Sequence, residues 1–445
     1  MVEVLESCFV VPSDETPKGR LWLSNLDQVA PREFVGFVHV YRNTDATNFF
    51  SVEVLKAALS KALVLFYPLS GRYAVGSDGR LVLDCNGEGC FFVRARLERA
   101  IDSINIQPSP ELERLFVPSI EMAGSKFVML MIQVTYMKCG GVVLGFAFNH
   151  ILGDARCNLH FIRTWASITR GDLSSIAPPS FDRTPLRART PPTIKFDHPE
   201  YIVEPTIRST LTGCTTTKFL LTKEQVRSLK TRCNNGSVSS VSSFCAVVSL
   251  VWKCYCDAQS LVPDTTANLM FTVGIRDRLK PPLSKYHFSN AIVRRSVQSK
   301  VSELTSNPLH VVAEQVKVAI DSVNDEYVRS LIDYLEIVKN QVFATMKVPE
   351  SHLRVTSISR MPVYDADFGC GEPDLVSRWK VSANRVVYIS DEPGVKGGME
   401  VVITVDSTTM HRFEKMFAGE LYAGNENISS GLEINRNYQI GQSKL

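Results

Sequence analysis

The chain has 445 residues, of which 44% are hydrophobic and 21% charged, a composition typical of a folded globular protein rather than of a disordered one. This length predicts roughly two or three domains. The formal net charge of +3 and the lack of a basic run with interleaved aromatic residues argue against a nucleic-acid partner. No stretch approaches the roughly 20 apolar residues that a membrane helix needs, so we expect no membrane-embedded segment.

The two ends of the chain bear on where the protein is found. Residues 1–8 are acidic and lack a basic region, so we expect no cleaved targeting peptide and a cytoplasmic location. The last three residues are Ser443, Lys444 and Leu445, which spell a peroxisomal address. A peroxisomal location therefore stays open. The alternative is that the terminal tripeptide occurs by chance and is not recognised by an import receptor.

The spacing of the 11 cysteines predicts no zinc site. Cys254 and Cys256 are separated by one residue, and Cys85 and Cys90 by four. Neither pair is accompanied by a second pair at the spacing of a zinc site. We expect reduced thiols, many of them buried as small hydrophobic side chains, and no metal ion.

Predicted helices and strands alternate through the first part of the chain. Apolar residues recur at helical spacing before Pro68, and Gly, Ser and Asp at residues 76–79 indicate a hairpin turn. In chain order we expect a helix over 49–65, a hairpin over 71–83, strands over 126–137 and 141–148, and an amphipathic helix over 157–169. These elements form the first predicted domain, residues 1–176.

Residues 177–205, with seven prolines and many charges, interrupt this pattern. They predict a crossover linker, which we assign to residues 177–210. The alternation of strands and helices then restarts in a second predicted domain, residues 211–445. Its expected elements are strands over 216–221, 268–273 and 401–405, strands flanking residues 364–371, and helices from 222, over 242–259, 309–324, 327–345 and 408–418.

The most informative feature is the pair His150 and Asp154, directly after the apolar strand expected at 142–148. A histidine at the end of a strand can be reached by a reacting group. An imidazole with an unperturbed pKa of about 6.5 can also accept a proton at neutral pH. The pair alone is weak, because a hydrogen-bonded core histidine beside a turn-forming aspartate has the same spacing.

A second motif lies far downstream, where Asp367, Gly369 and Gly371 stand in the run Asp-Phe-Gly-Cys-Gly. With this order of motifs, the chain resembles the BAHD acyl-CoA-dependent acyltransferases, and within them the branch of hydroxycinnamoyl-CoA shikimate/quinate hydroxycinnamoyltransferases. The resemblance runs the whole length of the chain. Four further stretches carry it: residues 21–27, 58–72, 181–189 and 325–335.

The resemblance implies an α/β fold of two similar chloramphenicol-acetyltransferase-like domains, each a mixed sheet with flanking helices, joined by a long crossover loop. It implies an enzyme of plant specialised metabolism that transfers an acyl group, hydroxycinnamoyl in this branch, from CoA to a hydroxyl or amine. Acyl-CoA is then a co-substrate, no cofactor is tightly bound, and the protein is a monomer. By resemblance, His150 is the general base within a ternary complex, and the already activated thioester requires no covalent enzyme intermediate.

Other motif residues receive supporting roles from the resemblance. Asp154 turns away from the substrate and pairs with an arginine that orders the loop behind His150. Arg276 is the best candidate for this partner, although a surface charge is the alternative. The residues of the second motif are structural, and its glycines allow backbone angles that other residues resist: Asp367, Gly369 and Gly371.

Two positions depart from the family pattern. Cys370 stands where the family has tryptophan, whose indole N–H is an oxyanion donor in the hydroxycinnamoyl branch, and a thiol is a much weaker donor. Ala155 replaces the glycine that often follows the aspartate of the first motif. A non-catalytic partner protein of the same fold is therefore an open alternative.

The expected acceptor site combines one matching residue with several departures. Arg360 matches the arginine with which shikimate-type relatives hold the acceptor carboxylate, a group that suits the guanidinium fork; a structural ion pair is the alternative. Val35, Phe37 and His39 stand where those relatives carry hydroxyl residues, and we assign His39 to the acceptor site. Apolar partners desolvate a polyol, so we expect an acceptor other than shikimate, with a polyamine or aromatic amine as the close alternative.

The donor site is the least defined by sequence. By charge and position, Lys253 and Arg278 are candidates for binding the phosphates of CoA. The alternative is that both are solvated surface residues. No Gly-x-Ser-x-Gly nucleophile elbow occurs, which argues against a serine hydrolase.

Overall fold

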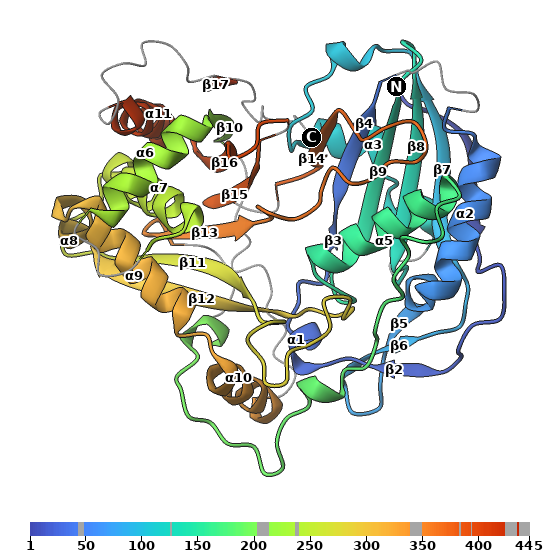
Figure 1. The fold of residues 1–445 in the computed structure, drawn as a ribbon, viewed down its shortest axis with the longest axis horizontal. Coiled ribbons are helices and arrows are strands. Elements are labelled where there is room, and N and C mark those ends of the chain that lie inside the picture. The colour runs from blue at the N-terminus through green and yellow to red at the C-terminus, as the bar shows by residue number, and fades with distance from the viewer. Residues whose placement is uncertain are drawn as a thin grey trace.

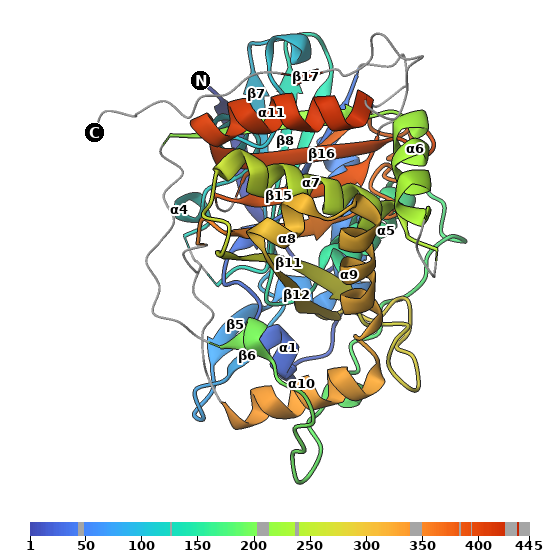
Figure 2. The ribbon, with the colours of Figure 1, turned by 90° about the vertical axis from the view of Figure 1, so that its left-hand side faces the viewer.

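The computed structural model describes residues 1–42, 49–124, 127–202, 213–235, 240–338, 349–381, 384–392 and 394–422, together with the backbone of residues 434–435. Two halves lie side by side, each built on a mixed β-sheet, with a seam between them (Figure 1). Figure 2 shows the helices of the second half lying across the outer face of its sheet.

The first half contains a sheet of seven described strands in the order β1-β7-β8-β9-β4-β14, with β3 paired to β9. Among these described pairs, β7 and β8 run parallel and the others antiparallel. The strands are β1 (Glu3–Val10), β3 (Phe34–Val35), β4 (Phe37–Tyr41), β7 (Cys90–Leu97), β8 (Leu130–Met137), β9 (Val142–Asn149) and β14 (Leu375–Arg378).

Both faces of this first sheet are covered. The helices α2 (Val52–Leu65) and α5 (Ala155–Thr169) pack on one face, and α3 (Pro110–Phe116) packs on the other, near α4 (Ile120–Ala123) and the short helix η2 (Ile101–Ser103). Burial from both sides explains why β9 is a continuous apolar run instead of an alternating one, with every residue buried. The central strand therefore holds its C-terminal end in a fixed place.

The second half contains a sheet of seven described strands in the order β12-β11-β13-β15-β16-β10-β17. The pairs β11–β13 and β13–β15 run parallel. The strands are β10 (Cys214–Leu221), β11 (Thr266–Gly274), β12 (Ile292–Lys300), β13 (His352–Ser357), β15 (Val386–Asp391), β16 (Met399–Asp406) and β17 (Ile434–Asn435).

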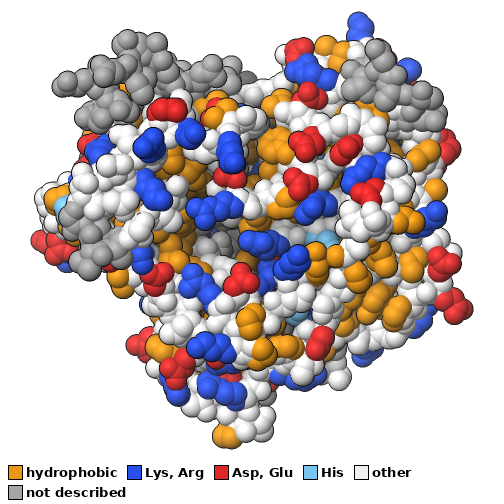
Figure 3. Space-filling view, viewed as in Figure 1, with side chains coloured by type: hydrophobic (Ala, Val, Ile, Leu, Met, Phe, Trp, Pro, Cys, Tyr) orange, Lys and Arg blue, Asp and Glu red, His pale blue; other side chains and the backbone are white. Residues whose placement is uncertain are grey.

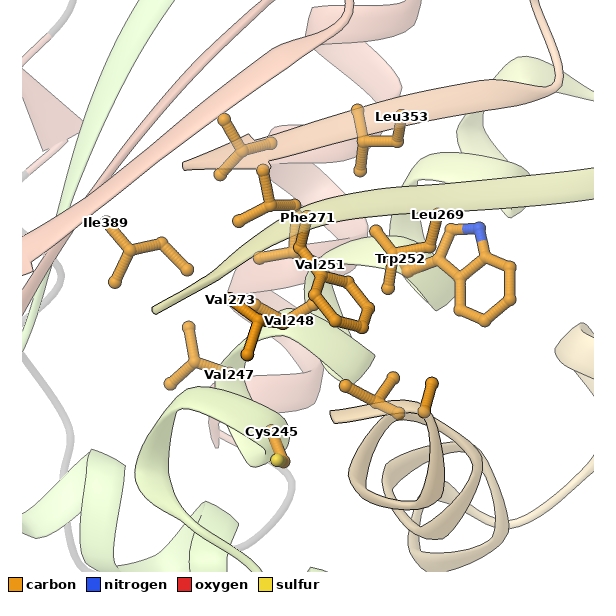
Figure 4. Packing of buried hydrophobic residues seen from close by; sticks show 14 of the residues in the cluster. Cys245, Val247, Val248, Val251, Trp252, Leu269, Phe271, Val273, Leu353 and Ile389 are labelled. Carbon is orange, nitrogen blue, oxygen red and sulfur yellow. The ribbon is translucent and has the colours of Figure 1, made fainter. Parts of the chain in front are cut away.

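Helices cover one face of this second sheet and form the largest apolar core. In Figure 4, Val248 and Trp252 lie against Leu269 and Phe271 of β11, with Leu353 of β13 close by. The helices are α6 (Lys223–Asn234), α7 (Ser243–Gln259), α8 (Val301–Ser306), α9 (Leu309–Asp321) and α11 (Ser407–Tyr422). The opposite face of the sheet lies toward the seam (Figure 1).

A smaller layer lies at one end of the two halves. It contains a sheet of three described strands, β2 (Arg20–Trp22), β5 (Arg72–Val75) and β6 (Leu81–Asp84), with the helix η1 (Tyr67–Ser70) directly before β5. The helices α1 (Asn25–Gln28) and α10 (Asp325–Ile337) pack against each other here, although they come from opposite halves of the chain. Residues 177–202 cross from one half to the other as an irregular segment with two short helices, η3 (Thr184–Leu186) and η4 (Pro199–Tyr201).

Most elements expected from the sequence are confirmed, with shifted ends. The expected hairpin is β5–β6, the expected strand pair is β8–β9, and Thr222 caps α6 through a capping box with Gln225. The expected helix at 49–65 begins only at Val52, and α10 is described to residue 338, so the rest of the helix expected over 327–345 lies outside the described residues. The edge strands β1 and β12, which carry mixed polar patterns, were missed, and so were the interior strands β4 and β7.

The predicted division of the chain at residues 177–210 meets one complication. Strand β14 follows the Asp-Phe-Gly motif late in the chain, yet it pairs antiparallel with β4 of the first sheet, through Val376 opposite His39 and Arg378 opposite Phe37. A division by chain position does not anticipate this strand exchange. The second part of the chain therefore builds one edge of the first sheet.

Candidate active site

His150 directly follows β9, at the start of a tight turn into α5. Its backbone N–H donates to the carbonyl of Glu33 at 3.0 Å. A Cβ added to Gly153 would lie 2.8 Å from Cβ of Cys157, so only glycine lets the turn pass this close to α5. Asp154 then caps α5 by accepting from the N–H of Cys157 at 3.3 Å.

The imidazole of His150 is partly exposed, but its Nδ1 is buried and has no hydrogen-bond partner among the described residues. Burial lowers the pKa of His150, and the charge of Arg378 lowers it further. The carbonyl of its own residue and the carboxylates of Glu33 and Asp154 oppose these effects on the pKa. His150 is therefore neutral at pH 7 and able to accept a proton.

The expected ion pair between Asp154 and Arg276 is present and buried. Arg276 Nη1 lies 2.7 Å from Oδ2 of Asp154, and Nη2 lies 3.0 Å from Oδ1, in the two-pronged geometry that suits a guanidinium. The N–H of Ala291 also donates to Asp154, at 3.1 Å. These contacts hold the buried carboxylate at the junction of the two halves.

Three residues that the sequence did not single out support the turn at His150. Asn290 donates from Nδ2 to the carbonyl of His150 at 2.9 Å, and Arg183 donates from Nη2 to the carbonyl of Leu152 at 3.2 Å. Asp27 joins both of them, accepting from Arg183 Nε at 3.0 Å and from the N–H of Asn290 at 2.8 Å.

The sequence carried a signal for two of these residues. Asp27 and Arg183 lie in the stretches 21–27 and 181–189, which carry the family resemblance. Both are charged residues, and neither stretch has enough apolar residues to form a core by itself. Asn290 is an uncharged residue in a loop, and nothing in its local sequence marks it. The ion pair between Asp27 and Arg183 is almost fully buried, with side chains 0% and 2% exposed.

The Asp-Phe-Gly motif forms a closed turn packed on the first half. The carboxylate of Asp367 accepts from the N–H groups of Gly369 and Gly371 at 2.8 and 2.9 Å. Both glycines have positive φ, +97° and +91°, which confirms the expectation that glycine is required there. Arg170, the residue that caps the C-terminus of α5, donates to the carbonyl of Asp367 at 2.7 Å, which ties the turn to the helix that follows the His150 turn.

Cys370 is partly buried, and its side chain packs against the apolar core of the first half. Burial raises the pKa of its thiol. A neutral thiol packed on a core is a poor substitute for an indole N–H aimed at an oxyanion.

The two residues predicted for the acceptor site have contrasting surroundings. His39 has no exposed surface, its two ring nitrogens have no hydrogen-bond partner among the described residues, and it packs edge-on against Phe146 at 5.2 Å. Burial lowers the pKa of His39 to about 3. Arg360 is exposed with a left-handed φ of +63°, and its N–H donates to Asp391 at 2.7 Å.

The two residues predicted to contact CoA donate to backbone carbonyls at helix ends. Lys253 donates to the carbonyls of Leu304, Thr305 and Asn307, around the end of α8. Arg278 donates from Nη1 to the carbonyl of Ile320 at 2.7 Å, near the end of α9. Such bonds stabilise helix C-termini, so each cation already has a structural role.

Two further findings concern the described residues as a whole. None of their helices is long and apolar enough to cross a membrane. No group of three or more His, Cys, Asp or Glu side chains among them could hold a metal ion. Residues 443–445, the terminal Ser-Lys-Leu, lie outside the described residues.

Comparisons with known proteins agree with this geometry. The model of the family described as "Transferase family" matches residues 1–419. The chain is 40% identical over 450 residues to putrescine hydroxycinnamoyltransferase 1 of Oryza sativa subsp. japonica, covering 94% of this chain and 99% of that protein. It is 36% identical over 432 residues to shikimate O-hydroxycinnamoyltransferase of Nicotiana tabacum, covering 93% and 98%.

Solved structures share the fold. Vinorine synthase superimposes with a TM-score of 0.75 and 23% identity, covering 93% of this chain and 96% of that one. F. graminearum TRI101, complexed with coenzyme A and deoxynivalenol, gives a TM-score of 0.76 and 16% identity, covering 89% and 97%.

These matches define the class of protein: an acyltransferase with the two-domain, chloramphenicol-acetyltransferase-like fold. The chain belongs to the BAHD family of acyl-CoA-dependent acyltransferases, and its relatives include hydroxycinnamoyltransferases. The expectations of this family, of an enzyme and of the fold are confirmed. Acyl-CoA is the co-substrate of the family.

Proposed function

We propose that this protein transfers a hydroxycinnamoyl group from CoA to a hydroxyl or amine acceptor in plant specialised metabolism, with His150 as the general base in a ternary complex. The observation that carries the proposal is the placement of His150. Its backbone is held from both sides, by Glu33 and by Asn290, while its imidazole is neutral and partly exposed near the seam. The named activities of the relatives supply the acyl group.

In the proposed mechanism, His150 accepts the proton of the acceptor O–H or N–H as the oxygen or nitrogen attacks the thioester carbonyl. The tetrahedral intermediate collapses when the bond from carbon to sulfur breaks. The CoA thiolate leaves and takes the proton back from the imidazolium, so His150 ends as it began. General-base catalysis of this kind contributes about 10²–10⁴-fold to the rate.

Asp154 and Arg276 act behind the base in this proposal. Their ion pair joins the start of α5 to the loop before β12, and Asn290 from that loop binds the carbonyl of His150. The pair therefore fixes the position of the imidazole relative to the second half, and correct placement of reacting groups is a large part of catalysis. In the same way, Asp367 fixes the position of the Asp-Phe-Gly turn, which lies between β13 and β14.

The relatives differ in whether they acylate a nitrogen or an oxygen atom of the acceptor. Putrescine and 5-hydroxyanthranilate are acceptors in the names of two relatives, which acylate nitrogen, and shikimate is the acceptor in the name of another, which acylates oxygen. The second candidate function is therefore N-acylation of a polyamine or aromatic amine. Shikimate itself is disfavoured in this proposal, because Val35 and Phe37 stand where shikimate-type relatives carry hydroxyl residues, and a polyol loses affinity when its hydroxyls are desolvated without partners.

Finer features of the proposal follow from the family and from composition. We keep Lys253 and Arg278 as predicted CoA contacts, although both cations also bind helix carbonyls. A cytoplasmic monomer is the proposed form, with a peroxisomal location if the terminal Ser-Lys-Leu is read. A non-catalytic partner protein, suggested by Cys370, is the remaining alternative.

The proposal is tested by CoA thiol release from coumaroyl-CoA, with a panel of acids, alcohols and polyamines and a blank without acceptor. His150→Ala is compared with His411→Ala, since His411 is an exposed histidine on α11 far along the chain from the motif. Acceptor-dependent release in the wild type and in His411→Ala, lost in His150→Ala, supports the transferase. Full activity in His150→Ala, or no release with coumaroyl-CoA and every acceptor, contradicts it.

A further inference from the structure

The two faces of the second sheet differ in chemistry. Residues 269, 271, 353 and 387 belong to the apolar core beneath the helices. The strand register places the alternate residues on the other face: Met270 is opposite Arg354, Thr272 is opposite Arg294, and Thr356 is opposite Tyr388. The face toward the seam thus carries two arginines where the helix face carries aliphatic side chains.

A third arginine reaches this wall from the first sheet. Arg378 lies on β14, opposite Phe37 of β4, yet its guanidinium lies over the ring of Tyr388, 4.3 Å from the ring centroid. It therefore spans the seam between the two sheets. The pKa of the partly buried Arg354 is lowered by burial and by the charge of Arg294.

The acidic groups near this wall have partners of their own. Glu33 forms an ion pair with Lys380 at 3.5 Å, and Glu400 forms one with Lys218 at 3.3 Å. Asp391 accepts from the hydroxyl of Ser359 and from the backbone N–H of Arg360.

By contrast, Arg378 forms no ion pair with any described residue, and its buried Nε has no hydrogen-bond partner there. A partly buried guanidinium without a carboxylate is an incomplete charge pair, which an anion of matching shape completes. Figure 3 shows Lys and Arg side chains gathered along the seam on this face of the molecule, so the surrounding potential also favours an anion.

The unpaired charge lies near the turn that carries the proposed general base. Arg378 is two residues before Lys380, which pairs with Glu33 at 3.5 Å, and the carbonyl of Glu33 accepts from the backbone N–H of His150 at 3.0 Å. The charge of Arg378 also contributes to the lowered pKa of the imidazole, after the larger effect of burial. It also lines a narrow pocket with Phe37, Val363 and Tyr388. An aromatic ring attached to an anion at Arg378 would meet apolar and aromatic walls in this pocket.

From this arrangement we propose that Arg378 binds the carboxylate of the acceptor, and that the acceptor is an aromatic acid with its hydroxyl or amine on the ring. The proposal rests on the acyl transfer proposed above and names its acceptor class. The phosphates of CoA are separated from the thioester by the whole pantetheine arm, so they do not reach an anion site beside His150.

The test compares acids with their uncharged counterparts. Each ring isomer of aminobenzoate and hydroxybenzoate is assayed with coumaroyl-CoA beside the matching benzamide and beside putrescine. The variants are Arg378→Gln, Arg378→Lys and Arg360→Gln, with Arg227→Gln, an exposed residue of α6, as the matched control. In the wild type we expect at least one benzoate to be used in preference to its benzamide and to putrescine.

Arg378→Gln is expected to raise KM for that benzoate about ten- to a hundredfold, because a charge-assisted hydrogen bond is lost, while KM for the benzamide and for coumaroyl-CoA stays unchanged. For Arg378→Lys, KM for the benzoate should lie between the values of the wild type and of Arg378→Gln, since lysine keeps the charge and loses the forked guanidinium geometry. Arg227→Gln should match the wild type.

Several outcomes overturn the proposal. One is a wild type that uses benzamides or putrescine as well as the benzoates, and another is a preference for acids lost in Arg360→Gln but kept in Arg378→Gln. A third concerns the source of the carboxylate: if Arg378→Gln impairs only the use of malonyl-CoA, the anion belongs to the acyl donor. If no acceptor supports CoA release, acyl transfer itself fails. Calorimetric binding of the benzoates then decides, because binding lost in Arg378→Gln supports the subsite and no binding to the wild type overturns it.

Discussion

The two sides of His150 differ in how their charges are paired. Behind the histidine, Asp154 pairs with Arg276 and Asp27 pairs with Arg183, and both ion pairs are buried. In front of it, Arg378 has no acidic partner among the described residues. A buried ion pair fixes the positions of its two side chains, whereas an unpaired charged side chain is available to bind a ligand of opposite charge. The comparison separates the ion pairs that hold the turn at His150 from the arginine proposed to bind the acceptor.

The largest expected effect is the loss of the base that both sides serve. His150→Ala should lower kcat by about 10²–10⁴-fold, because the acceptor is no longer deprotonated during attack. Steady-state CoA release gives kcat, and circular dichroism with thermal unfolding checks that the fold is kept. A variant that keeps more than a tenth of wild-type kcat would refute the role of His150.

The next effect concerns the buried pair behind the base. Arg276→Met leaves Asp154 charged and buried without its partner, which should destabilise the protein by about 3–5 kcal/mol. The double variant Arg276→Met with Asp154→Leu removes both charges and should recover much of this loss. Urea unfolding measures both, and a double variant no more stable than the single one would contradict the explanation that the unpaired charge of Asp154 causes the loss.

A smaller effect is expected for Asn290→Ala. Its side chain donates to the carbonyls of His150 and Ile151, and losing these buried bonds should cost about 1–3 kcal/mol of unfolding free energy. Because the turn at His150 is then held less firmly, kcat should fall while KM for coumaroyl-CoA changes little. An unchanged kcat in a destabilised variant would make Asn290 purely structural.

The smallest effect links the two sides through pH. The lowered pKa of His150 means that the neutral base persists below pH 6.5, so activity should be kept from neutral pH into that range and then fall as the imidazole is protonated. Arg378→Gln removes a positive charge that lowers this pKa, so the acid limb should move to higher pH. Glu33→Gln removes a negative charge that raises it, and the limb should move to lower pH. Profiles of kcat/KM against pH measure both shifts, and shifts of the same sign would contradict the electrostatic assignment.

Elements with strong local patterns could be predicted from the sequence. The alternating and continuous apolar runs of β8 and β9, the capping residue Thr222 of α6 and the glycines of the Asp-Phe-Gly turn all depend on short-range physics. The edge strands β1 and β12 lacked such patterns, because a strand with one partner and a partly exposed face carries polar residues.

The candidate site shows the same division. His150 and Asp154 stand in one turn, and the resemblance supplied Arg276 as the partner of Asp154, so this part was predictable. Asn290 and Arg378 were not, because their partners lie far away in the chain. His39 was expected at the acceptor site by its position in the sequence, but the sheet buries its side chain completely.

By itself, the sequence determined the family and the order of many elements, and it supplied the residue proposed as general base, since motif spacing and apolar periodicity are properties of neighbouring residues. Only the tertiary structure decided which charges are paired. The strand exchange of β14 carries Arg378 from the second part of the chain across to Tyr388, and the turn after β9 meets Asn290 from the loop before β12. Charge pairing depends on distances between elements remote in the chain, and those distances exist only once the two sheets have packed together.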